Sequence, residues 1–167
     1  TGLGPLDHGM SFLAGAEGLR IGREGLQPIR QFLGEVGDAP FFLWYAPMLP
    51  HTPHNPPLDL LKKYQATDRP ETIAKYMAMC EWFDQTCGQL IQLLDEAGKG
   101  ENTLIAFIVD NGYVQLPGVN WFDKRSKLSP YEAGVRTPIF LHWPGHIPPG
   151  RHDSLVHAID LAPTILA

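Results

Sequence analysis

The sequence predicts an α/β fold with a mostly parallel central sheet flanked by helices, and three observations lead to that class. Residues 103–109 form a continuously apolar, β-branched run that ends at turn residues, as a fully buried strand of a parallel sheet does. Residues 40–46 (PFFLWYA) form a second apolar and aromatic run with the composition of a central strand. Between these runs, apolar residues recur every three or four positions over residues 73–94, as in an amphipathic helix. Strand, helix and strand in this order indicate a right-handed crossover unit.

The remaining elements follow from the same periodicities. Residues 1–25 hold seven glycines and little periodicity, so we expect an irregular surface there. Apolar positions at helical spacing predict a helix over residues 26–36 and a short one over residues 57–64. Pro70 opens the long helix, and glycines at positions 98 and 100 end it.

The last third of the chain is less regular. An irregular stretch at residues 113–130 precedes a third expected strand at residues 139–143. Residues 155–166 are expected to pass from strand to helix, with Asp160 as the N-cap and Pro163 in the first turn.

Composition excludes several classes of protein. The chain has 167 residues, of which 44% are hydrophobic and 19% charged, as in a single globular domain. The net charge is −5 and the basic residues form no long run, so we expect no nucleic-acid partner. The longest apolar runs are strand-sized, far below the roughly 20 residues that span a bilayer, so we expect no membrane partner.

The two cysteines, Cys80 and Cys87, lie seven residues apart in a helical pattern. That separation is a rise of about 10.5 Å, which is too long for a disulfide. Both fall on the apolar face, so we expect two reduced thiols packed in the core. Neither cysteine has a metal-ligand spacing.

Two oxygen-bearing side chains, Asp110 and Asn111, follow the run at residues 103–109 directly. In open parallel sheets the ligand crevice lies outside the carboxyl ends of the strands. A carboxylate and an amide oxygen are hard donors, suited to Ca²⁺ or Mg²⁺. Asp-Asn and Asn-Gly are also ordinary turn residues, so on these residues alone a plain turn remains an alternative.

A loop at residues 47–57, directly after the second run, contains five prolines and two histidines, His51 and His54. This density of proline forbids regular structure and fixes the backbone. A rigid loop suits a catalytic imidazole, because little ordering entropy remains to be lost. A rigid connector whose histidines face water is the alternative.

Four segments, taken together and in this order, resemble the sulfatase family of the alkaline-phosphatase-like superfamily. They are PFFLWYAPMLPHTPHNPP, YMAMCEWFDQTCGQLIQLLDEAGKGENTLIAFIVDNG, KLSPYEAGVRTPIFLHWPGHIPPG and IDLAPTIL. The matching segments fall within residues 26–167. The resemblance therefore implies that residues 1–167 are part of a sulfatase catalytic domain, with an incomplete alkaline-phosphatase-like sheet.

The resemblance implies roles for four residues. Asp110 and Asn111 match the family's second pair of calcium ligands, with Ca²⁺ preferred to Mg²⁺. His51 matches the histidine that contacts the sulfate ester, and we expect it on a loop near Asp110. Lys127 matches the lysine that binds sulfate. His51 and Lys127 are therefore expected to have catalytic and substrate-binding roles, and both fit the chemistry of a sulfate monoanion.

Charged neighbours of Lys127 belong to the same matching region. Lys124 and Arg125 lie so close in sequence that the lysine role could fall a few residues away. Glu132 and Arg136 are expected to hold the loop rather than to contact the substrate.

The sequence also lacks parts of the family pattern. The family's nucleophile is a cysteine in a C-x-P-S-R type motif, converted to formylglycine, and neither Cys80 nor Cys87 fits that motif. An N-terminal pair of Asp ligands and a G-K-W-H-L-G type segment are also missing. In the family all of these lie upstream of the first matching segment. We therefore expect a carboxyl-side portion of the catalytic domain that has no turnover by itself, with the formylglycine in an upstream part.

The whole protein is expected to be an arylsulfatase-like sulfuric ester hydrolase that uses formylglycine and calcium. Its substrate would be a sulfated small molecule or a sulfated carbohydrate, and family resemblance implies a periplasmic or secreted location. Two alternatives stay open. One is a phosphoester or phosphonate hydrolase of the same superfamily, and the other is a non-catalytic binding module that has lost the nucleophile.

Overall fold

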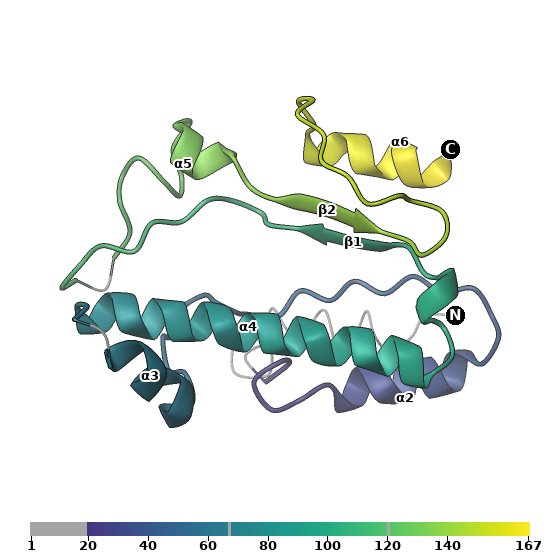
Figure 1. The fold of residues 1–167 in the computed structure, drawn as a ribbon, viewed down its shortest axis with the longest axis horizontal. Helices are drawn as coiled ribbons and strands as arrows, with labels where there is room; N and C mark the ends of the chain where they lie inside the picture. Colours follow the sequence, from purple (N-terminus) through teal and green to yellow (C-terminus); the bar gives the residue numbers. More distant parts are fainter. Residues whose placement is uncertain (1–19, 67, 120) are drawn as a thin grey trace. The chain divides into compact units, whose positions relative to one another are not determined.

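The computed structural model describes residues 20–66, 68–119 and 121–167, and the chain divides into two compact units (Figure 1). The first unit comprises Thr1–Gly100 and Gln115–Phe122, and the second comprises Glu101–Val114 and Asp123–Ala167. The irregular surface expected at residues 1–25 lies outside the described residues as far as residue 19. Residues 20–25 form a hydrogen-bonded turn.

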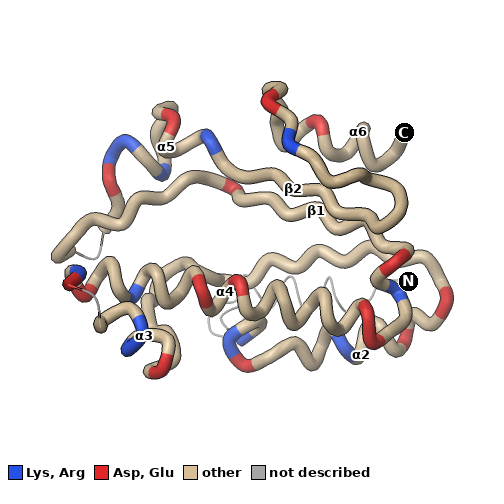
Figure 2. The backbone as a smooth tube through the Cα atoms, in the orientation of Figure 1, with Lys and Arg blue, Asp and Glu red and all other residues tan. Residues whose placement is uncertain are grey.

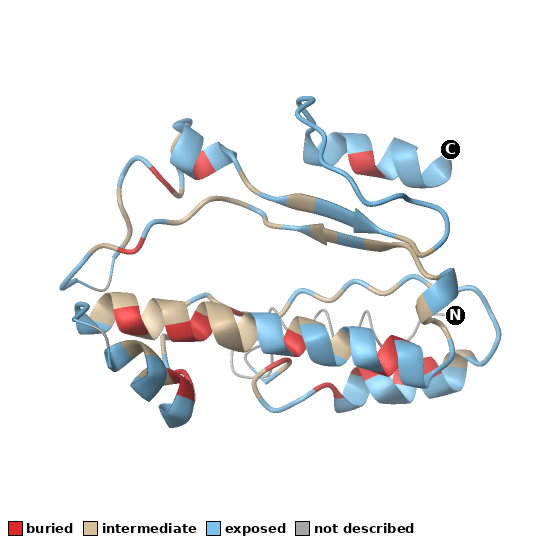
Figure 3. Cartoon of the chain, in the orientation of Figure 1, coloured by how far each residue is buried: buried red, intermediate tan, exposed pale blue. Residues whose placement is uncertain are grey.

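The described part of the first unit is built on α2 (Gln27–Val36), α3 (Leu58–Gln65) and α4 (Glu71–Glu96). These bounds agree with the three predicted helices to within one or two residues. In Figure 1, α3 lies along the N-terminal part of α4 and α2 along its C-terminal part. Buried apolar residues occur on all three helices (Figure 3). The buried set comprises Ile29, Phe32, Leu33, Leu60, Ala74, Ala78, Met79, Leu93 and Leu94.

Ion pairs join the helices of the first unit. The guanidinium of Arg30 on α2 lies 3.0 Å from the Glu96 carboxylate on α4. The Lys63 ammonium on α3 lies 2.7 Å from the Glu81 carboxylate on α4. Acidic and basic residues both occur on each of these helices (Figure 2). Among the described helices, none has both the length and the apolar character needed to cross a membrane.

Cys80 and Cys87 both lie on α4 as free thiols, so the prediction that they are reduced is confirmed. Both are half-buried rather than fully packed in the core. Burial raises the pKa of each thiol.

The strand predicted at residues 40–46 is wrong for the chain as described. These residues are extended and alternate in exposure, with Phe42 79% and Trp44 81% exposed, but they join no sheet among the described residues. A strand requires a ladder of backbone hydrogen bonds to a neighbour, and no described residue supplies that neighbour. The apolar composition of residues 40–46 therefore indicates an extended segment, but it does not show whether that segment pairs with another strand.

The second unit contains β1 (Ile105–Ile108) and β2 (Ile139–His142), which pair antiparallel. Ile105 faces His142 at one end of the ladder and Ile108 faces Ile139 at the other. Between them, the Phe107 and Phe140 rings stack with centroids 5.7 Å apart.

Both strands were predicted, but the parallel sheet and the full burial of residues 103–109 were not confirmed. The sheet described here has two strands, so β1 has one ladder partner and open faces. Its burial alternates accordingly, and Ile108 is 43% exposed. The fold shown is thus a mixture of helices and strands. Apolar composition could not specify which strand would pair with β1.

The C-terminal segment contains a 3₁₀ turn, η2 (Ala158–Asp160), and α6 (Leu161–Leu166), with no strand from residue 155 onwards. The predicted helix is confirmed, and Asp160 does stand at its N-cap position. The Asp160 carboxylate, however, accepts a hydrogen bond from the His157 backbone N–H and caps η2. No side-chain cap is made to α6.

Candidate active site

The Asp110-Asn111-Gly112 turn follows β1 after one intervening residue, Val109, and so lies at the carboxyl end of the strand, as predicted. The Asn111 backbone N–H donates to Asp110 Oδ1 at 2.8 Å, and Asn111 Nδ2 donates to the Gly112 carbonyl at 3.0 Å. These bonds leave Asp110 Oδ2 and Asn111 Oδ1 without a hydrogen-bond donor among the described residues. Asp110 is exposed and Asn111 is half-buried. The turn thus presents two uncommitted oxygens from adjacent residues.

Two hard oxygens fit part of a calcium coordination shell, which takes six to eight such ligands. Within the described ranges, no group of three or more His, Cys, Asp or Glu residues could hold a metal ion. Asp110 and Asn111 therefore suit two places in a calcium site whose other ligands would come from elsewhere in the protein. Their metal role stays a prediction.

Backbone packing fixes the position of this turn. The Gly112 N–H donates to the Gly134 carbonyl at 2.8 Å, and Gly134 belongs to the short helix α5 (Glu132–Val135). A Cβ on Gly112 would collide with the Ala133 carbonyl and lie 3.2 Å from Gly134 Cα. The turn and α5 touch through backbone because Gly112 has no side chain to separate them.

Gly134 makes a second close approach, to the loop that carries Lys127. A Cβ on Gly134 would collide with the Ser126 carbonyl and lie 2.6 Å from the Ser129 carbonyl. Ser126 is fully buried, and its hydroxyl donates to the Asp123 carbonyl at 2.6 Å. The Ser129 hydroxyl donates to the Ser126 carbonyl, also at 2.6 Å. This loop is therefore pinned on both sides of Lys127.

Lys127 differs from the two neighbouring cations. Lys124 is exposed, and the Arg125 guanidinium lies 4.7 Å from the centre of the Tyr131 ring. Lys127 is half-buried, and its ammonium makes no hydrogen bond or ion pair with a described residue. The next residue, Leu128, has φ 63°, a left-handed conformation that costs energy for a branched side chain. Of the three cations, Lys127 is the one both held in place and left uncommitted.

Glu132 and Arg136 were predicted to hold this region. They form an i,i+4 ion pair of 2.5 Å across α5, with both side chains 74% exposed. The pair spans α5 at the surface. The contacts that hold the loop come from Gly134 and the two serines, which the sequence reasoning missed.

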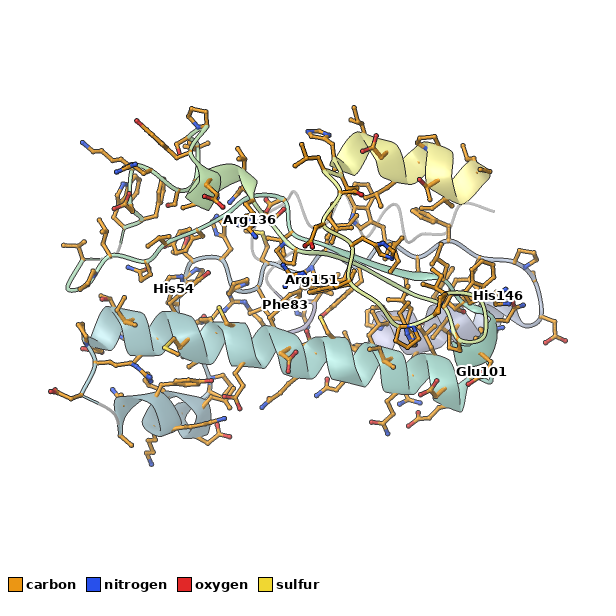
Figure 4. All side chains as sticks on the ribbon, turned by 45° about the horizontal axis from the view of Figure 1, so that its top comes forward. His54, Phe83, Glu101, Arg136, His146 and Arg151 are labelled. Carbon is orange, nitrogen blue, oxygen red and sulfur yellow. The ribbon has the colours of Figure 1, made fainter. Side chains whose placement is uncertain are left out.

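His51 and His54 lie on the proline loop, residues 47–57, in the first unit. His51 is exposed, and its Nδ1 lies 3.0 Å from the Thr52 carbonyl. The His54 ring is half-buried beside α4 (Figure 4), with its centroid 5.6 Å from that of Tyr76. Burial lowers the pKa of His54 first, and electrostatic repulsion from His51, Arg23 and Lys75 lowers it further, against a backbone hydrogen bond at Pro50. These surroundings favour the neutral form of the His54 ring.

The second unit brings Asp110, Asn111 and Lys127 into one structure through α5. His51 belongs to the first unit. Its closeness to Asp110 stays a prediction.

Comparison with known proteins gives the family. The sulfatase family model matches residues 23–167. The chain is 35% identical over 132 residues to the uncharacterized sulfatase YdeN of Escherichia coli, covering 77% of this chain and 23% of that protein. It is 33% identical over 134 residues to human arylsulfatase A, covering 78% of this chain and 25% of that protein. The chain belongs to the sulfatase family.

The chain is also similar to a solved structure. The crystal structure of Ps i-CgsB in complex with k-i-k-neocarrahexaose superposes with a TM-score of 0.71 at 33% identity, covering 83% of this chain and 31% of that one. A sulfatase of Formosa agariphila is 36% identical over 141 residues, or 26% of its length. This chain therefore spans about a quarter of the length of the curated relatives it matches.

Proposed function

We propose that the protein containing this chain hydrolyses sulfate esters, and that the second unit supplies part of its metal and sulfate site. The observation that carries this proposal is the backbone packing of Gly112 and Gly134. It ties two uncommitted oxygens, on Asp110 and Asn111, to the loop that holds the uncommitted ammonium of Lys127. A metal-assisted sulfate site needs oxygen ligands for the metal ion and a positive group for the sulfate, held close to each other by the backbone.

Asp110 Oδ2 and Asn111 Oδ1 would hold Ca²⁺, in preference to Mg²⁺, together with ligands from upstream. Calcium, when bound, supplies positive charge against the sulfate and the attacking group. The hydrogen bond within the turn orients the Asp110 carboxylate before any metal arrives. Such preorganisation avoids reorganisation cost when charge develops.

Lys127 would bind a sulfate oxygen. Its ammonium is a compact charge on a flexible stem, and its backbone is anchored by the neighbouring serines. His51 would contact the ester oxygen, where an imidazole can donate or accept a proton near neutral pH. Both roles place positive or proton-donating groups where negative charge grows.

The nucleophile would be a formylglycine in the upstream part of the protein. Cys80 and Cys87 are poor alternatives, because both are half-buried on α4 and burial raises the pKa of each thiol. A raised pKa lowers the thiolate fraction at neutral pH. This chain alone is therefore expected to show no turnover.

A sulfated carbohydrate is the substrate class we favour. Similar proteins include an N-acetylgalactosamine-6-O-sulfatase and an endo-4-O-sulfatase of Bacteroides thetaiotaomicron, at 26% and 28% identity. We further infer that in the whole protein β1 joins a mostly parallel sheet. A periplasmic or secreted location would accord with such substrates.

The test compares two lysines in the whole protein. Lys127→Ala should lower kcat/KM on a sulfate ester by about 10²–10³-fold, as removal of an oxyanion-stabilising group does. Lys124→Ala, an exposed cation three residues away, should leave it unchanged. Equal effects of the two changes would refute the assignment, and turnover on phosphate esters alone would favour the phosphoesterase alternative.

The metal role is tested on the present chain by calorimetric titration with calcium chloride. We expect weak binding that Asp110→Ala abolishes, because affinity depends on ligand charge. Asp153→Ala is the control, since Asp153 is an 85% exposed carboxylate of the same unit. Calcium binding that survives Asp110→Ala would place the site elsewhere.

A further inference from the structure

Arg23 makes an unusual number of contacts to the proline loop. Its Nη2 donates to the carbonyls of Met48, His51 and Pro53 at 3.0, 3.2 and 3.3 Å. Its Nη1 donates to the side-chain oxygen of Asn55. One guanidinium thus bonds to four oxygens spread along the loop.

The loop has few other means of holding its shape. Five of its eleven residues are prolines, which have no N–H to donate, and the loop belongs to no helix or strand until α3 begins at Leu58. Its carbonyls must nevertheless find donors where they turn away from water. A guanidinium supplies up to five donors in a rigid plane, and a lysine ammonium cannot reproduce that geometry.

Arg23 is itself held in place. Its guanidinium carbon lies 5.5 Å from the centre of the Trp82 ring on α4, and Arg23 is half-buried. The preceding Gly22 has φ 79°, and a Cβ there would lie 2.6 Å from the Tyr45 hydroxyl. The turn at residues 20–25 therefore packs on the segment that leads into the proline loop, which brings the Arg23 side chain to the loop carbonyls.

We propose that Arg23 is the positioning residue that fixes the proline loop and, through the His51 carbonyl, the orientation of His51. The part given to His51 rests on the proposed function, whereas the fixing of the loop does not. Arg23 also acts on the second histidine, because its charge is among the causes that lower the His54 pKa, after burial and His51. The other positive group that lowers it is Lys75.

The experiment is nuclear magnetic resonance on the 167-residue chain, with two substitutions that separate charge from geometry. Arg23→Gln removes the charge and the planar set of donors, so exchange of the Asn55 amide proton, which donates to the Pro53 carbonyl at 3.1 Å, should rise about tenfold or more, and the His54 pKa should rise. Arg23→Lys keeps the charge, so the His54 pKa should stay low while amide exchange still rises. Arg30→Gln is the control, because Arg30 is exposed and pairs with Glu96 away from the loop.

Asn55→Ala is the milder variant and decides the matter if Arg23→Gln does not fold. Asn55 is exposed, and replacing its side chain removes one acceptor for Arg23, so a smaller rise in exchange of the amide proton at position 55 is expected. A folded Arg23→Gln chain with unchanged exchange would overturn the proposal. If amide exchange in the Arg23→Lys chain equals that in the unsubstituted chain, the planar guanidinium geometry is not required.

Activity gives a separate readout in the whole protein. Arg23→Gln should lower kcat by about tenfold or more, since a displacement of about 1 Å can cost 10²-fold. Arg30→Gln should leave kcat unchanged. If the parent protein has no sulfatase activity, the proposed function fails, while the amide exchange still decides whether Arg23 fixes the loop.

Discussion

Replacing Gly112 by alanine should destabilise the second unit, although the same substitution stabilises many chains. Gly112 does not require a positive φ, so a methyl group would ordinarily reduce the entropy of the unfolded state by about 0.4–1 kcal/mol. Here the added Cβ would lie 2.8 Å from the Ala133 carbonyl carbon and closer still to its oxygen. Both are backbone atoms and cannot rotate away.

The expected magnitude follows from these contacts. Forcing a methyl group into a packed backbone contact costs about 1–3 kcal/mol. The 2.8 Å hydrogen bond from Gly112 to Gly134 would lengthen, which costs about 1 kcal/mol more. Against the entropic gain, the net loss in the free energy of unfolding of the second unit should be about 1–3 kcal/mol.

The assay is exchange of the Gly112 amide proton, which reports opening of this part of the chain, together with urea unfolding. Gly88→Ala is the matched control, because Gly88 is exposed on α4 and a Cβ there meets nothing within 4 Å. That change should stabilise by about 0.5–1 kcal/mol, since glycine disfavours a helix interior. If Gly112→Ala stabilises as Gly88→Ala does, the packing argument is wrong.

Two further substitutions test the first unit. Gln115→Ala should cost about 1–3 kcal/mol in urea unfolding, because the 6% exposed amide donates to the carbonyls of Leu116, Val119 and Trp121. Gln92→Ala, at an exposed position, is the control and should change stability by less than about 0.5 kcal/mol. Burial raises the pKa of Tyr45 to about 12, so its contribution is complete below pH 10 and should be lost as pH rises towards 12. Tyr45→Phe should therefore flatten the fall in stability between pH 10 and 12 in urea unfolding, and an unchanged fall would contradict this origin.

The helices could be predicted because their signals are local. In α4 the apolar stripe repeats within each turn, and Pro70 and Gly98 stand at its two ends. Strand pairing depends on a partner elsewhere in the chain, so the run containing β1 was recognised as a strand while its pairing with β2 was not. The run at residues 40–46 shows the same limit.

The candidate site divides in a similar way. Asp110 and Asn111 were expected at a strand end, and they follow β1 after one intervening residue, Val109. Arg23 and Gly134 were missed, because their importance comes from contacts with distant backbone. Arg23 stands in a glycine-rich stretch with no periodicity, and no sequence signal could have found it without the proline loop in place.

The contacts that order the candidate site of the second unit join residues close in sequence. The strands that would complete its sheet lie further away along the chain. Asp110, Lys127 and Gly134 lie within 25 residues of one another along the chain. The backbone of Gly134 contacts Gly112, next to the Asp110-Asn111 pair, and the serines on either side of Lys127. This arrangement can form from local contacts alone. The sheet beside it leaves Ile108 43% and Phe140 62% exposed, and such apolar faces gain free energy when covered. A site ordered by local contacts beside an open sheet therefore supports the proposal that this chain binds calcium weakly and shows no turnover by itself.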